Sequence, residues 1–170
     1  MNTNHIRIKN KFRLAGFTIV EIILGIGMLT MFISANFYYY KAVLDVSQQT
    51  TKHIQSGFLL EEGVEAVKLL RDESWSANIA PLLTDGTQYY LSWNGTKWGT
   101  TTTPVLVEDI YMRYFVLESV GRNLVTDDID AGGANDPGTR KVIVTVSWNT
   151  KSSVVGSSTV ETYITDLFAN

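Results

Sequence analysis

The chain has 170 residues, enough for one ordinary domain with an appendage; 45% of the residues are hydrophobic and 18% are charged. It has no cysteine and only two histidines, which excludes disulfide frameworks and thiolate chemistry and argues against a histidine-based metal site or catalytic triad. Motifs of serine hydrolases, zinc proteases and P-loop proteins are also missing, so we expect no enzyme.

Charge divides the chain into three parts. Residues 1–16 hold four basic side chains and no acid, and residues 17–40 hold a single charged residue, Glu21. Residues 41–170 hold ten basic and sixteen acidic side chains, and this acidic body argues against nucleic acid as a partner. We therefore expect a basic head, an apolar neck and an acidic body.

The apolar neck has the length of a membrane span. As a helix, residues 17–40 would extend roughly 36 Å, at about 1.5 Å per residue, and the hydrocarbon core of a bilayer is about 30 Å thick. Three tyrosines at 38–40 have the composition of an interfacial aromatic belt. The positive-inside rule then places residues 1–16 in the cytoplasm and residues 41–170 outside.

A secretory signal is the alternative for this segment. Such signals also have a basic start and an apolar middle, and cleavage after Ala35 would release a β-rich protein. Their apolar region is usually shorter, about 7–15 residues, and carries no charge. Glu21 therefore counts against the signal interpretation. A carboxylate inside a span is by default a functional candidate whose partner must be named.

The stretch "GFTIVEIILGIGMLTMF" (residues 16–32) resembles the processing and membrane segment of type IV prepilins and type II secretion pseudopilins. The resemblance covers about residues 10–40. It implies that a prepilin peptidase of the bacterial inner membrane cuts after Gly16 and N-methylates Phe17, and that Glu21 is the assembly residue. The partners it implies are the peptidase, an inner-membrane assembly platform, membrane lipid and other pilin or pseudopilin subunits.

Cleavage would supply the cation that Glu21 lacks. The new amine at Phe17 is positive, and on a neighbouring subunit it can pair with Glu21 in a filament core without water. Gly25 and Gly27 would permit close helix approach, or they are simply tolerated in a membrane helix. The absence of cysteine and of a proline in the span favours a minor pilin or pseudopilin over a major pilin.

The helix is expected to continue beyond the membrane as an amphipathic stem over residues 41–75, so that one helix runs from about Phe17 to about Ser74. The predicted core stripe is interrupted by one acid and consists of Val43, Val46, Thr50, Ile54, Phe58, Glu61, Val64 and Leu69.

Residues 76–170 are predicted to form an extracytoplasmic β-rich head. Asn94-Gly95 between aromatic stretches is a type I′ hairpin signal, which we prefer to the glycosylation sequon that Asn94 also begins. Alternating or β-branched stretches predict a central strand and two further strands, at 109–120, 140–148 and 159–168. The expected fold is α+β: a long N-terminal helix laid across an antiparallel sheet of four or five strands.

One acidic loop, residues 126–141, is the only metal-site candidate. Its oxygen-bearing side chains are Asp127, Asp128, Asp130, Asn135 and Asp136. Calcium takes six to eight oxygen ligands, and some pseudopilins in the family that the chain resembles bind calcium near the C-terminal strands. A solvated acidic turn is the alternative, because Asp, Asn, Gly and Pro all favour turns. No other cofactor is expected.

The leading interpretation is a structural subunit of a type IV pilus or type II secretion-like filament. A membrane-anchored extracytoplasmic binding domain that never polymerises is the alternative from another class of protein.

Overall fold

The computed structural model describes residues 16–149 and 155–167. Its elements in chain order are α1 (Ile19–Glu73), the short π-helix η1 (Trp75–Ile79), β1 (Tyr89–Trp93), β2 (Trp98–Thr101), β3 (Leu106–Val107), β4 (Tyr111–Arg122), β5 (Ala134–Asn149) and β6 (Val155–Thr165). The chain divides into two compact units, Met1–Val46 and Ser47–Asn170. Each unit is described by itself.

In the first unit, the described residues form the beginning of α1. The large side chains are apolar on all sides of this helix and exposed, as shown by Met28 (75%) and Phe32 (68%). A helix that is apolar all round requires an apolar surrounding, either a protein core or a membrane. By length and composition, α1 contains a segment able to cross a membrane, which is the property of a membrane anchor or a signal.

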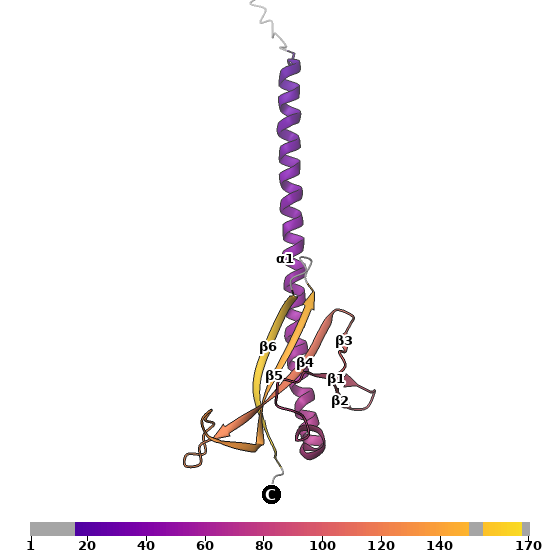
Figure 1. Ribbon diagram of the computed structural model, residues 1–170. Coiled ribbons are helices and arrows are strands. Elements are labelled where there is room, and N and C mark those ends of the chain that lie inside the picture. Colours follow the sequence, from indigo (N-terminus) through magenta and orange to yellow (C-terminus); the bar gives the residue numbers. More distant parts are fainter. Residues whose placement is uncertain (1–15, 150–154, 168–170) are drawn as a thin grey trace, which may run out of the picture. The chain divides into compact units, whose positions relative to one another are not determined.

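In the second unit, the remainder of α1 packs on an antiparallel sheet (Figure 1). The sheet has six strands in the order β2-β1-β4-β5-β6, with β3 paired to β4. Val142, Val144 and Val146 of β5 are fully buried, and they alternate with partly exposed neighbours. The α+β prediction is confirmed, and so are the central position of β4 and the half-buried pattern of β5, but the sheet has six strands and not the four or five predicted.

The face of α1 that contacts the sheet differs from most of the predicted stripe, although Val64 does pack against the core. Ile54, Phe58 and Leu69 are more than half exposed. The buried positions are mostly smaller: Ser56, Gly63, Ala66, Val67 and Leu70. A Cβ on Gly63 would lie 2.8 Å from Cγ1 of Val144, so the helix approaches β5 too closely for a larger residue. The prediction relied on large apolar side chains and therefore missed a helix face that packs mainly through small residues.

A buried arginine also joins α1 to the sheet. Arg113 of β4 is 4% exposed, and its Nη1 lies 2.9 Å from Oε2 of Glu62 on α1. The guanidinium also lies over the indole ring of Trp98, 5.2 Å from the ring centroid. Its Nε has no hydrogen-bond partner among the described residues. This partly buried ion pair therefore adds to the apolar contact between the helix and the sheet.

Two turn predictions require correction. The β1–β2 hairpin exists, but its loop has four residues, since Trp93 pairs with Trp98. Asn94 does not adopt the positive φ that a type I′ turn needs, whereas Gly95 does (φ 98°). The Asn94 side chain closes the loop instead, accepting a hydrogen bond from the Lys97 amide (2.9 Å). The acidic loop is also shorter than predicted, because β5 already begins at Ala134.

Candidate functional site

The predicted cleavage site lies just before α1. Gly16 and Phe17 are exposed and non-helical, and the helix begins at Ile19. Residues 1–15, which are all of the predicted basic leader except Gly16, lie outside the described residues. The backbone at the predicted scissile bond is therefore free of helical hydrogen bonding.

Glu21 occupies the first turn of α1. Its backbone amide donates to the carbonyl (3.0 Å) and to the hydroxyl (3.4 Å) of Thr18. Thr18 thus caps the helix, and the Thr-x-x-Glu spacing is the sequence signal that would have predicted this start. The positive end of the helix dipole favours a carboxylate there by about 0.3–1 kcal/mol. This position reduces the cost of a lone carboxylate in an apolar segment.

No described residue holds the carboxylate of Glu21 by a hydrogen bond or an ion pair. Other polar side chains of the apolar segment are bonded within their own helix. The Thr30 hydroxyl donates to the carbonyl of Ile26, and Ser34 and Asn36 donate to carbonyls four residues earlier, both at 2.8 Å. Such bonds leave little polar surface to satisfy in a bilayer. Among the described residues of this segment, Glu21 is the one charged side chain.

Gly25 and Gly27 leave open space on the surface of α1. A Cβ added to either would meet no atom within 4 Å. Their backbones are therefore accessible to a second helix. This accessibility agrees both with close helix packing and with simple tolerance of glycine in a membrane helix.

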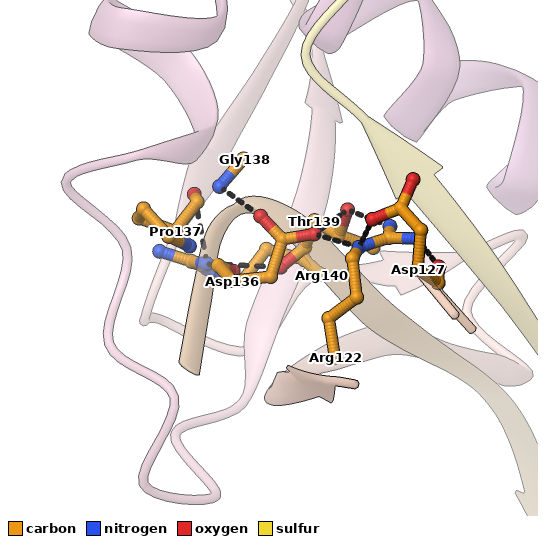
Figure 2. A network of polar contacts seen from close by, with 7 residues as sticks. All are labelled: Arg122, Asp127, Asp136, Pro137, Gly138, Thr139 and Arg140. Atoms are coloured by element: carbon orange, nitrogen blue, oxygen red, sulfur yellow. Dashed lines mark hydrogen bonds and ion pairs between the residues drawn. The ribbon is translucent and has the colours of Figure 1, made fainter. Parts of the chain in front are cut away.

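The acidic loop is organised around an arginine (Figure 2). Nε of Arg122 donates to Oδ2 of Asp136 (2.9 Å), and the Thr139 hydroxyl donates to the same oxygen (2.7 Å). The Gly138 amide donates to Oδ1 (2.9 Å). The hydrogen bond from Thr139, aided by Arg122, lowers the pKa of Asp136, although burial opposes the effect. Asp136 is thus an ionised anchor for the end of the β4–β5 hairpin.

The other predicted calcium ligands have separate surroundings. Asp127 lies near Arg122, with 3.7 Å between Oδ1 and Nε, and its carbonyl accepts from Nη1 (2.6 Å). Asp130 accepts from the Gly132 amide (3.0 Å). The two remaining candidates, Asp128 and Asn135, lie on the exposed loop and at the start of β5.

The structure therefore brings Asp127 and Asp136 together around the guanidinium of Arg122, which is a cation of the chain itself. Among residues 16–149 and 155–167, no three His, Cys, Asp or Glu side chains gather in a way that could hold a metal ion. The calcium site stays a prediction, since backbone and amide oxygens also serve as ligands. The sequence did not reveal the ion pair between Arg122 and Asp136, because Arg122 precedes the predicted loop and is 14 residues from Asp136.

No protein-family model, curated protein or solved structure matches this chain. Its architecture is nevertheless pilin-like: a long, apolar N-terminal helix whose later part packs on a C-terminal antiparallel sheet. The structure thus establishes the class of fold, whereas the resemblance to a cleavage and methylation motif is found in the sequence alone.

Proposed function

We propose that this chain is a structural subunit, a minor pilin or pseudopilin, of a type IV pilus or type II secretion-like filament. It is cut after Gly16 and methylated at Phe17 by a prepilin peptidase, and it polymerises through the first part of α1. The observation that carries the proposal is Glu21: the one charged residue of an otherwise apolar segment, in the first turn of its helix and without a described partner.

Before assembly, residues 17–40 lie in the inner membrane, with the leader in the cytoplasm and the β-rich head outside. Glu21 then lies near the cytoplasmic edge, where a carboxylate costs less than at mid-bilayer. Membrane lipid, the peptidase and the inner-membrane assembly platform are the partners at this stage. The role is structural and not catalytic.

Assembly replaces lipid around the exposed apolar side chains of α1 with the helices of neighbouring subunits. The Phe17 amine of one subunit then meets Glu21 of another. At 4 Å, unit charges attract by about 4 kcal/mol at an effective dielectric constant of about 20. Desolvation offsets much of this attraction, so the pair sets the register of the helices more than it adds stability.

The experiment compares Glu21→Gln with Glu61→Gln, an exposed glutamate farther along the same helix. Each variant is expressed with a prepilin peptidase and an assembly system, and sheared filaments are quantified by immunoblot and electron microscopy. We expect Glu21→Gln to be cleaved and membrane-bound but to form no filaments, and Glu61→Gln to assemble normally. Normal filaments from Glu21→Gln would refute the assembly role. Cleaved wild-type chain that never leaves the membrane fraction would favour the non-polymerising anchor instead.

A further inference from the structure

A small pocket lies between the end of α1 and the β1–β2 hairpin. Its volume is about 230 Å³, and its lining consists of Leu69, Leu70, Glu73, Trp93, Thr96, Lys97 and Trp98. Leu70 is buried and forms part of the core, whereas Trp93 and Leu69 are each 54% exposed. An indole ring is thus displayed to solvent at the mouth of the pocket.

The two indole rings form an angled pair. Trp93 and Trp98 are cross-strand partners, with ring centroids 5.3 Å apart and planes at 58°. The buried guanidinium of Arg113 also lies over the Trp98 ring, 5.2 Å from the ring centroid. Trp93 therefore packs against a ring that also contacts Arg113, and its own exposed surface is available for a ligand.

The rim of the pocket is also held in place. The Asn94 side chain accepts hydrogen bonds from the amide and the hydroxyl of Thr96 (3.0 and 3.1 Å) and from the Lys97 amide. Nζ of Lys97 lies 2.9 Å from Oε1 of Glu73, which ties the loop to the end of α1. The hydrogen bond from Lys97 lowers the pKa of Glu73 and keeps it ionised. A site fixed in this way loses little entropy on binding.

We propose that this pocket binds one ring of a neutral saccharide. The exposed face of Trp93 fits the apolar C–H face of a sugar ring, and Glu73 and Lys97 offer an acceptor and a donor to its hydroxyls. The two charges cancel each other, which favours an uncharged ligand over an anion or a cation. The volume is below the roughly 300–1,000 Å³ of pockets that enclose drug-sized ligands, so a single ring fits.

A protein partner fits the pocket less well. Stable protein interfaces bury about 800 Å² on each side, and only Trp93 and Leu69 among the lining residues display a large apolar surface. The proposal does not depend on filament assembly, because every residue of the site belongs to the unit Ser47–Asn170.

The test uses the full chain in phosphatidylcholine nanodiscs, since common sugar-based detergents would compete for the site. Neutral oligosaccharides of glucose, galactose, mannose and N-acetylglucosamine are titrated to about 10 mM, a range that covers millimolar dissociation constants. Tryptophan fluorescence and saturation-transfer NMR report binding. We expect at least one of these sugars to bind, with contacts from its ring protons to an indole.

The variants separate binding from folding. Trp93→Ala should weaken binding at least about tenfold, and Trp93→Phe should restore most of it, because the ring stays. Tyr163→Ala is the matched control, since Tyr163 is an exposed aromatic residue (49%) outside the pocket. The unfolding midpoint of each variant verifies that the head is folded.

The proposal is overturned if no sugar in the panel binds, or if the affinity is unchanged in a folded Trp93→Ala chain. It is equally overturned if Trp93→Ala alters self-association or lipid binding while leaving sugar binding intact, because the pocket would then serve a second copy or a membrane.

Discussion

Asp136→Asn tests the anchor of the β4–β5 hairpin. The substitution preserves shape but replaces one carboxylate oxygen with an NH₂ group. If this group takes the place of Oδ2, it faces two donors, Nε of Arg122 and the hydroxyl of Thr139. If the amide turns over, the donor faces the Gly138 amide instead. Neither orientation satisfies all three donors.

The magnitude follows from the bonds that are lost. The side chains of Asp136 and Arg122 are 19% and 27% exposed, so the pair is only partly screened by water. Hydrogen bonds to charged groups contribute about 1.5–3 kcal/mol each and are not additive, so we expect a loss of about 2 kcal/mol in the free energy of unfolding. In a head of this size, the midpoint would fall by about 5–10 °C.

The assay is thermal and urea unfolding of the full chain in nanodiscs, followed by near-ultraviolet circular dichroism. Asp128→Asn is the matched control, because Asp128 is an exposed aspartate of the same loop. Its effect should stay within about 0.5 kcal/mol, as for ordinary surface substitutions.

The direction of the Asp136 pKa shift predicts how the stability difference between wild type and Asp136→Asn changes with pH. The pKa of Asp136 is lowered in the folded chain, whereas an aspartate in an unfolded chain has a pKa of about 3.9. Its stabilisation is therefore present above the unfolded pKa and is lost as pH falls through the folded pKa. The difference between wild type and Asp136→Asn should be full at pH 7 and should shrink below about pH 4. A difference that is absent at pH 7, or that grows on acidification, would refute the reasoning.

Three further outcomes are expected from the same unfolding measurements. Gly156→Ala should cost about 1–3 kcal/mol, because its Cβ would lie 2.6 Å from the ring of the buried Trp148; an unchanged midpoint would show that the ring can move. Glu62→Gln should cost about 2 kcal/mol by leaving the cation of Arg113 without its carboxylate, and a neutral result would mean that the ion pair adds nothing to helix–sheet packing. If the loop of residues 126–141 binds calcium, millimolar Ca²⁺ should raise the midpoint, and an unchanged midpoint would contradict that site.

The fold could largely be predicted from local sequence patterns. The alternation of Val142, Val144 and Val146 predicts a half-buried strand, and the absence of proline before Pro81 predicts one long helix. These signals work because a strand or helix repeats its environment every two or about four residues.

The contacts between elements could not be predicted in this way. Nothing in the sequence around Gly63 indicates that it is the point where α1 meets β5. The predicted acidic loop is partly strand, because β5 begins at Ala134 and Asp136 is bonded to an arginine on the opposite strand. In each case the deciding partner is distant in sequence, so no local pattern reveals it.

The candidate site divides in the same way. A linear motif in the sequence assigned roles to Gly16, Phe17 and Glu21. The structure adds that Thr18 caps the helix and that no described residue bonds to the Glu21 carboxylate. The saccharide pocket had no sequence signal beyond two tryptophans five residues apart. It depends on how a hairpin packs against the end of a helix.

The most direct test of the central claim is the mass of the N-terminal peptide from chain expressed with a prepilin peptidase. A proposed pilin subunit should begin at N-methylated Phe17, so that cleavage has supplied the amine that Glu21 needs. A mature chain that still begins at Met1, or that begins at Asn36, would contradict the account.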